Sequence, residues 1–191
     1  MNKKIYLIRH GKTEGNIQKR YIGITDESLS EAGKNEISSF HYPSAEIVFV
    51  SPMKRCIETA KIIYPSQKVT IINELKETDF GDFEGKNYEE LKSVPEYIRW
   101  MESGGKTAFP NGENPADVTA RVMKGFKKLL SFSSGNSSIA AIVHGGTIMS
   151  ILSELFGGNY YDYIVENGKG YSFDISSDGI YSGLSSGSFD R

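Results

Sequence analysis

Four short apolar runs constrain the fold of this chain more than any other feature of its sequence. They cover residues 4–8, 46–50, 69–72 and 139–143, and helix-like segments separate them. Runs of this length, rich in Ile and Val and bounded by polar residues, are typical of buried strands. Buried strands that alternate with helices predict an α/β sandwich around a largely parallel sheet.

Amphipathic spacing and capping residues predict where the helices lie. Ser30 is a suitable cap for a helix over 31–40, and Ser51 caps a second helix over 53–64 with Pro52 at its first position. Further helices are expected over 88–101 with a break at Pro95, over 115–132 and over 147–156. Residues 160–165 and 170–175 are expected as edge strands, and the Gly/Ser-rich end, 182–191, as a frayed tail.

Size and charge set limits on the class of protein. With 191 residues, no repeats and no linker-like stretch, the chain is expected to form a single domain over 1–191. Lys and Arg number 22 against 24 Asp and Glu, a net charge of −2, which argues against nucleic acid as a partner.

Cysteine content and hydropathy add expectations about the compartment. The lone Cys56 excludes an intramolecular disulfide and leaves too few thiolates for a structural zinc site. The apolar run near the N-terminus is shorter than a signal peptide, and no run approaches the roughly 20 residues of a membrane span. We therefore expect a cytoplasmic protein without a membrane partner; the oligomeric state is left open.

Polar clusters follow three of the four predicted strands. They are Arg9-His10-Gly11, Ser51 with Arg55 one helical turn later, and His144-Gly145-Gly146. Because the carboxyl ends of parallel strands meet at one edge of a sheet, these clusters are expected to gather in space. Arginine forks, glycine N–H groups and the start of a helix all favour an anion. The pattern predicts an anion pocket that contains two imidazoles.

Such a pocket has the parts for phosphoryl transfer. A neutral imidazole is a capable nucleophile when an acceptor holds one ring nitrogen and leaves the lone pair of the other free. The leaving alkoxide then needs a proton donor, which a carboxyl group can supply. The acidic loop after the third strand offers Glu77, Asp79, Asp82 and Glu84.

These residues carry a resemblance to a known family. Leu7-Ile8-Arg9-His10-Gly11-Lys12-Thr13-Glu14-Gly15-Asn16, Ser51-Pro52-Met53-Lys54-Arg55, Leu75-Lys76-Glu77 with Phe80-Gly81-Asp82-Phe83-Glu84-Gly85, and Val143-His144-Gly145-Gly146 follow one another in order. Together they resemble the histidine phosphatase superfamily, also called phosphoglycerate mutase-like. The resemblance implies a three-layer α/β/α sandwich with a mostly parallel central sheet.

The resemblance also implies roles for individual residues. His10 is the nucleophile that becomes phosphohistidine, and Glu77 occupies the position of the proton donor, with Glu84 and Asp82 as competitors. The phosphate-binding residues are Arg9, Arg55 and His144, with Thr13 and Asn16 at the edge of the pocket and Gly145 at the start of the last helix. No metal or organic cofactor is implied, and the partner is a small-molecule phosphoester.

Within the family, the short chain resembles the phosphatase branch. Arg20-Tyr21-Ile22-Gly23 with Asp26 and Leu29 is similar to α-ribazole phosphatases of cobalamin biosynthesis, so Tyr21 and Gly23 are candidates for a substrate loop. Ser28 and Asn114 depart from the usual pattern, in segments that shape specificity. Two alternatives remain: a phosphoglycerate mutase-type phosphotransferase, and a non-catalytic relative that binds a phosphorylated ligand.

Overall fold

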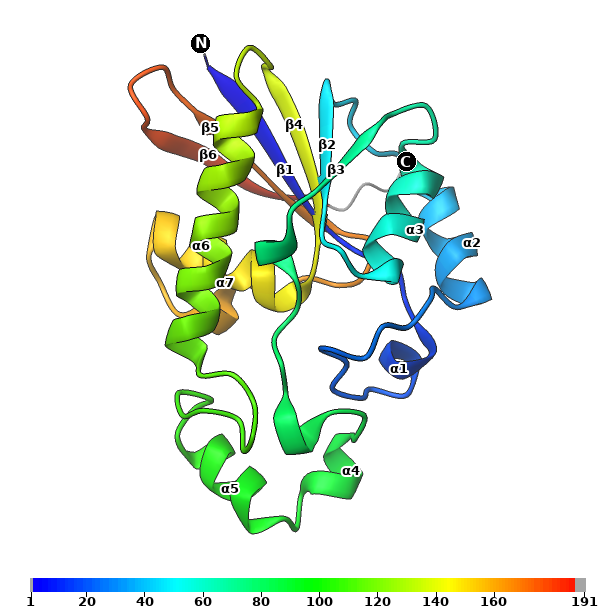
Figure 1. Ribbon diagram of the computed structural model, residues 1–191, viewed down its shortest axis with the longest axis vertical. Coiled ribbons are helices and arrows are strands. Elements are labelled where there is room, and N and C mark those ends of the chain that lie inside the picture. Colours follow the sequence, from blue (N-terminus) through cyan, green and yellow to red (C-terminus); the bar gives the residue numbers. More distant parts are fainter. Residues whose placement is uncertain (1, 188–191) are drawn as a thin grey trace.

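The computed structural model describes residues 2–187 and shows one six-stranded sheet between two layers of helices (Figure 1). The strands are β1 (Lys3–Arg9), β2 (Ile47–Val50), β3 (Val69–Ile71), β4 (Ser138–Val143), β5 (Gly170–Ile175) and β6 (Tyr181–Gly187). Their spatial order is β3-β2-β4-β1-β5-β6. Only β5 runs against the others, since it pairs antiparallel with both neighbours. The predicted fold class, with its mostly parallel sheet, is confirmed.

Helices cover both faces of this sheet. They are α1 (Glu14–Ile17), α2 (Glu31–Ser39), α3 (Lys54–Ile63), α4 (Tyr88–Leu91), α5 (Pro95–Glu102), α6 (Pro115–Phe132) and α7 (Gly145–Phe156). In Figure 1, α6 and α7 lie on one face, α2 and α3 lie on the other, and α4 and α5 form the lower end of the molecule. Short 3-10 helices cover Asn73–Leu75, Gly81–Phe83 and Tyr160–Tyr163.

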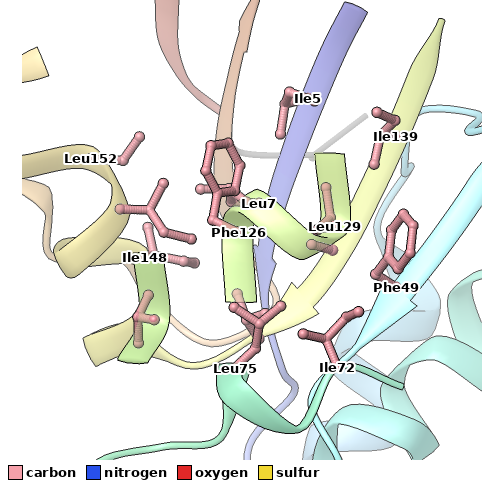
Figure 2. Packing of buried hydrophobic residues seen from close by; sticks show 14 of the residues in the cluster. Ile5, Leu7, Phe49, Ile72, Leu75, Phe126, Leu129, Ile139, Ile148 and Leu152 are labelled. Atoms are coloured by element: carbon pink, nitrogen blue, oxygen red, sulfur yellow. The ribbon is translucent and has the colours of Figure 1, made fainter. Parts of the chain in front are cut away.

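Two apolar cores hold the layers together, one on each face of the sheet. Alternate residues of a strand point to opposite faces, so Ile5 and Leu7 of β1 pack under α6 and α7, while Ile8 packs under α3. Figure 2 shows the larger core, in which Phe126 of α6 and Ile148 of α7 meet the sheet. Both faces are buried, which explains why β1 and β4 appear as continuous apolar runs.

A third, separate apolar cluster lies beyond the sheet, in the segment between β3 and α6. Phe83, Tyr97, Trp100 and Phe109 pack around Leu91 with their rings mostly edge to face. This cluster gives residues 80–109 a small core of their own, since no strand runs through that segment.

Several predicted elements differ from the structure. Residues 160–165 are not a strand: Asn159 and Asp162 cap one another across a 3-10 helix, and this local pairing replaces a ladder. The strand over 170–175 is not at an edge, because β6 pairs outside it.

The prediction of a frayed tail from residue 182 is also wrong for residues 182–187. Those residues form β6, and Tyr181 and Leu184 pack on the larger core. The remaining residues of that prediction, 188–191, lie outside the described part of the chain.

The start of α3 differs from its prediction for a functional reason. The helix begins at Lys54 after an N-cap at Met53, so Ser51 and Pro52 precede it. The Ser51 hydroxyl is engaged with His144 instead.

None of the helices in residues 2–187 combines the length and the hydropathy that crossing a membrane would require.

Candidate active site

The two histidines meet because β1 and β4 are parallel neighbours in register. Arg9 is paired with Val143 at the ends of these strands, and the next residues of the two strands are His10 and His144. The His10 backbone N–H donates to the Val143 carbonyl at 3.0 Å. The imidazole rings lie edge to face with centroids 5.2 Å apart. The predicted gathering of these strand ends is therefore observed.

His10 is held in one tautomer. Its Nδ1 lies 2.7 Å from the Gly11 carbonyl oxygen, which can only accept, so Nδ1 carries the proton and Nε2 keeps its lone pair. Burial lowers the pKa of His10 well below its usual value, and the nearby charges of Arg55 and Arg9 lower it further. The ring is therefore a neutral imidazole with a free nitrogen, as the nucleophile in phosphoryl transfer must be.

His144 is neutral for the same reasons. Burial lowers its pKa most, followed by the charge of Arg55. Its Nε2 lies 2.7 Å from the Ser51 hydroxyl, which orients the ring. The Cys56 thiol packs 3.6 Å from the same nitrogen, and burial raises the pKa of this thiol, so it adds no charge to the site.

Two buried guanidinium groups supply positive charge. Arg55 is fully buried and donates to the carbonyls of Gly23 and Thr25, each at 2.8 Å. Arg9 donates to the Val165 carbonyl at 2.7 Å. Within residues 2–187, the Nε–H groups of both arginines are buried and have no hydrogen-bond partner. Because buried charged donors are normally satisfied, this pair indicates a site for an anion.

A pocket of about 200 Å³ opens over these groups. Among the residues predicted from the sequence, it is lined by Arg9, His10, Asn16, Tyr21, Glu77 and Gly145. His144, Arg55, Thr13 and Gly23 are buried and are not among its lining residues. Arg20 also lines the pocket, and its guanidinium forms an ion pair with Glu90.

Thr13 and Asn16 form a capping box at the start of α1. The Thr13 hydroxyl accepts from the Asn16 backbone N–H, and Asn16 Oδ1 accepts from the Thr13 backbone N–H. Asn16 Oδ1 also accepts from Asn167 Nδ2 at 3.2 Å. With its oxygen bound twice, Asn16 presents its Nδ2 as the free donor, which suits an anion.

The acidic loop brings one carboxylate into the pocket. Glu77 is 8% exposed, and its Oε1 and Oε2 accept from the backbone N–H groups of Thr78 (2.9 Å) and Gly146 (3.4 Å). Glu84 is turned to the loop instead, where Oε1 accepts from the backbone N–H groups of Gly23 and Thr25. Asp82 is exposed and accepts from Asn111. Of the three candidates for proton donor, only Glu77 lines the pocket.

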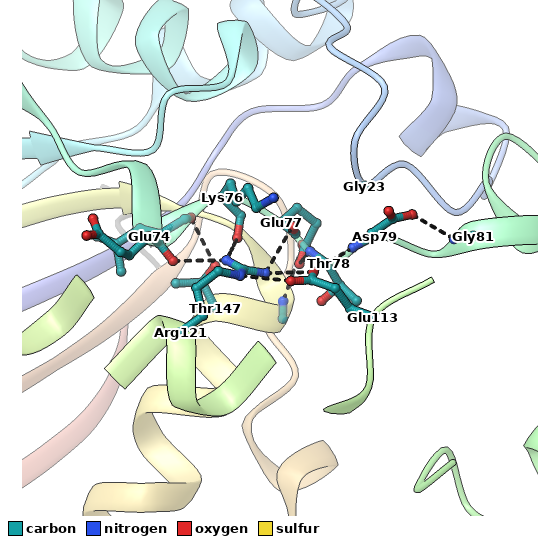
Figure 3. A network of polar contacts seen from close by, with 12 residues as sticks. Gly23, Glu74, Lys76, Glu77, Thr78, Asp79, Gly81, Glu113, Arg121 and Thr147 are labelled. Atoms are coloured by element: carbon teal, nitrogen blue, oxygen red, sulfur yellow. Dashed lines mark hydrogen bonds and ion pairs between the residues drawn. The ribbon is translucent and has the colours of Figure 1, made fainter. Parts of the chain in front are cut away.

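An ion pair outside the pocket fixes the backbone around Glu77 (Figure 3). Arg121 of α6 binds both carboxylate oxygens of Glu113, at 2.9 and 2.8 Å. The same guanidinium donates to the carbonyls of Glu74 and Lys76 at 2.9 Å and to that of Glu77 at 3.4 Å. Glu113 in turn accepts from the Asp79 backbone N–H. The pair thus clamps the loop on both sides of Glu77.

The two residues predicted for a substrate loop have different surroundings. A Cβ on Gly23 would lie 1.8 Å from the Thr78 carbonyl oxygen, so only glycine allows this loop to approach the acidic loop. Tyr21 packs in the third apolar cluster, with its hydroxyl 3.1 Å from that of Tyr97, and also lines the pocket.

Three residues shape the site through contacts that the sequence does not reveal. The sequence places Ser51 among the strand-end clusters and predicts it as a helix cap, whereas its hydroxyl contacts His144. Its place after a strand, opposite a second strand-end histidine, is a usable signal for that contact. Asn167 donates to the His10 carbonyl and to Asn16 Oδ1 from a loop 157 residues away from His10, and no local pattern marks it. The sequence marks Gly146 only as part of a helix start, whereas its N–H donates to Glu77.

Across residues 2–187, no group of three His, Cys, Asp or Glu side chains is arranged to hold a metal ion.

Comparison with known proteins places this site in a family. Residues 5–180 match the model of the histidine phosphatase superfamily (branch 1). The chain is 32% identical over 165 residues to phosphoserine phosphatase 1 of Hydrogenobacter thermophilus, covering 81% of this chain and 76% of that protein. It is 31% identical over 165 residues to the uncharacterized phosphatase PhoE of Bacillus subtilis, covering 81% and 78%.

A solved structure shows the same architecture. The α-ribazole phosphatase of Shigella flexneri superposes with a TM-score of 0.85 at 26% identity, over 98% of this chain and 97% of that one. The chain therefore belongs to the histidine phosphatase superfamily (branch 1).

Proposed function

We propose that the protein hydrolyses a small phosphomonoester through a phosphohistidine on His10. The observation that carries this proposal is the state of His10: a neutral ring with a free Nε2 beside two buried arginines that have unpaired N–H groups. A phosphoryl group in the 200 Å³ pocket would lie beside Arg9 and His10, which line it, and would feel the charge of Arg55, which also acts on His10.

The first step forms the covalent intermediate. The Nε2 lone pair of His10 attacks phosphorus as the ester P–O bond breaks, and the leaving oxygen takes a proton from the Glu77 carboxylic acid. Arg9 and Arg55 bind the phosphoryl oxygens, assisted by Asn16, His144 and the N–H of Gly145 at the start of α7.

The second step regenerates the enzyme. Water attacks phosphorus and gives its proton to the Glu77 carboxylate, and the P–N bond breaks with its electron pair returning to Nε2. One residue acts as acid and then as base because the leaving oxygen and the water occupy the same side of phosphorus.

For the substrate, we propose α-ribazole 5′-phosphate, which would place the enzyme in cobalamin biosynthesis. The support is the substrate-loop pattern Arg20-Tyr21-Ile22-Gly23 together with the structural similarity to the Shigella flexneri α-ribazole phosphatase. Phosphoserine is the competing candidate, since the similarity to the Hydrogenobacter thermophilus enzyme favours it.

The test is phosphate release from a panel of esters with EDTA present: α-ribazole 5′-phosphate, phosphoserine, phosphoglycerates, sugar phosphates, nucleotides and p-nitrophenyl phosphate. A kcat/KM for α-ribazole 5′-phosphate about a hundredfold above the others corresponds to about 2.7 kcal/mol of selective transition-state binding and supports the assignment. A flat profile leaves the mechanism in place and removes the substrate assignment. Transfer to a second hydroxyl with a long-lived phosphoenzyme would indicate a mutase, and no turnover of any ester would indicate a binding protein.

A further inference from the structure

A second and larger pocket adjoins the phosphate pocket. Its volume is about 1,040 Å³, against about 200 Å³ for the first. Tyr21, Phe80, Gly146 and Met149 line both, so the two pockets share a wall. The first has room for a phosphoryl group and a small leaving group, whereas a large leaving group has to extend beyond it, and the adjoining second pocket offers the space.

Gly146 lines both pockets and lies against Glu77 of the first. A Cβ on Gly146 would lie 2.6 Å from Glu77 Oε1 and 3.1 Å from the Tyr160 hydroxyl, so glycine allows both side chains to pack against the start of α7 where the two pockets adjoin. An ester whose phosphoryl group lies against His10 and whose body lies in the second pocket would pass its bridging oxygen beside Glu77. That is where the proton donor of the proposed reaction has to be.

The walls of the second pocket favour an uncharged, flat ligand. Aromatic rings of Tyr21, Phe80, Trp100, Phe109, Tyr160 and Tyr161 line it. Its charged lining residues are Lys106 and Glu154, and both are exposed and belong to the rim. A buried cation that would bind the carboxylate of a small acidic leaving group is therefore not found among these lining residues.

Two buried polar atoms in the same wall point to a ligand that accepts hydrogen bonds. The Trp100 indole N–H and the Ser150 hydroxyl are buried and make no hydrogen bond of normal length within residues 2–187. The polar neighbour of Ser150 is the Tyr160 hydroxyl, which itself donates to the Gly146 carbonyl at 3.2 Å. Buried polar groups in native proteins are nearly always satisfied, so an acceptor on a bound molecule accounts for them.

We propose that this second pocket is a leaving-group subsite that selects phosphomonoesters of uncharged alcohols with an aromatic body, and that Trp100 and Ser150 determine this specificity. The inference rests on the proposed phosphatase function and narrows its substrate class. It favours a substrate with an aromatic base, such as α-ribazole 5′-phosphate, over phosphoserine and phosphoglycerates.

Two esters with similar alkoxide leaving groups separate the subsite from the chemistry: 2-phenylethyl phosphate and ethyl phosphate. In the wild type, kcat/KM for the phenylethyl ester should exceed that for the ethyl ester by about tenfold or more, since only the former fills apolar space. Ala120 is an exposed residue of α6 that lines the second pocket, and Ala120→Trp would fill that space. This variant should lose the preference while its rate on ethyl phosphate stays unchanged, and Ala120→Ser should behave as the wild type.

A binding measurement checks the same point without a variant. Trp100 is the only tryptophan of the chain, so its emission reports on this pocket. Titration of 2-phenylethyl phosphate should shift the emission, whereas ethyl phosphate and inorganic phosphate should not.

Each result has a distinct meaning. Hydrolysis of both esters at equal kcat/KM, with no emission change, overturns the subsite and leaves the phosphatase standing. Failure to hydrolyse any ester, p-nitrophenyl phosphate included, overturns the proposed function and this inference together.

Discussion

The ends of β1 and β4 and the segment of residues 73–115 build the two halves of the site by different means. At the strand ends, His10 and His144 follow parallel strands in register and are almost completely buried. Residues 73–115 contain short helices and loops, and no strand of the sheet. Side-chain contacts hold that segment: the Arg121–Glu113 pair at its base and the aromatic cluster at its tip.

The contrast suggests a division of labour. Residues bound to a hydrogen-bonded sheet are held rigidly, which suits a nucleophile and phosphate ligands that need accurate positions. Residues on a segment with its own small core can change without disturbing the sheet, which suits an acid and a leaving-group pocket. We therefore expect substitutions in the first half to affect all substrates, and those in the second half to discriminate between substrates.

The largest effect is expected from His10→Ala, which tests the strand-end half. Turnover of every ester should fall to background, because the variant lacks the Nε2 lone pair that attacks phosphorus in the proposed reaction. Gel analysis at neutral to alkaline pH, which preserves the acid-labile P–N bond, should show no phosphoenzyme after brief incubation with ³²P-labelled substrate, whereas the wild type is labelled. The circular dichroism spectrum of the variant should stay that of the wild type. Labelling that persists in this variant would show that another residue is the nucleophile.

Glu77→Gln should have the next largest effect and should discriminate between substrates. Loss of a general acid costs about 10²–10⁴-fold on alkyl phosphates, whose alkoxide needs a proton. It should cost far less on p-nitrophenyl phosphate, because nitrophenolate leaves unprotonated. The comparison requires kcat on both ester types.

Glu84→Gln is the matched control, since Glu84 ties the loop at Gly23 and Thr25 and does not line the pocket. It should affect both ester types alike. If Glu77→Gln also lowered both rates equally, the acid would have to lie elsewhere, with Glu84 as the first candidate.

The two halves also differ in how far the sequence predicted them. The strand-end clusters were visible because a strand leaves a local apolar signature and parallel strands bring their ends to one edge. That is why His10, His144 and the arginines could be placed together from the pattern alone. The roles of individual residues, Glu77 above all, came from the family resemblance.

The rest depends on contacts between distant residues, which leave no local pattern. Asn167 reaches the site from the loop before β5, and Ser51 pairs with His144 instead of capping a helix. Trp100 and Phe109 were ordinary aromatic residues in the sequence, and their packing into a separate cluster that borders a pocket appears only in the structure.

The two halves should also differ in the pH range over which their groups affect the stability of the protein. The pKa values of His10 and His144 in the folded protein lie well below 6.5, the value expected in the unfolded chain. As pH falls below 6.5, the unfolded chain therefore binds protons that the folded protein does not, and the folded state loses stability. Between pH 7 and 5.5 the two histidines together should remove about 2–3 kcal/mol from the free energy of unfolding.

Urea denaturation in phosphate-free buffer measures this loss, and the double variant His10→Gln/His144→Gln should show a flatter profile of stability against pH. Equal pH profiles for the wild type and the double variant would contradict the buried neutral histidines.

The Arg121–Glu113 pair that holds residues 73–115 should lose its contribution to stability in another pH window. Burial raises the pKa of Glu113, but hydrogen bonds from Arg121 and from the Asp79 N–H outweigh it, so the net pKa lies below 4.5. The stability contributed by this carboxylate should therefore fall only as the pH drops below about 4.5.

The smallest of these effects, and the most specific for the second half, is expected from Arg121→Met. Methionine keeps much of the apolar stem but cannot donate to the carbonyls on either side of Glu77, so the carboxyl group loses its position and not its chemistry. We expect kcat on alkyl phosphates to fall about tenfold, with little change on p-nitrophenyl phosphate. This is the pattern expected for Glu77→Gln in weaker form, and a merely destabilised protein would not show it.

Arg99→Met, which removes an exposed ion pair with Glu96 on α5, is the matched control and should leave both rates unchanged. A uniform loss on both ester types in Arg121→Met would mean that the clamp supports the whole pocket, and the division between the two halves would then fail.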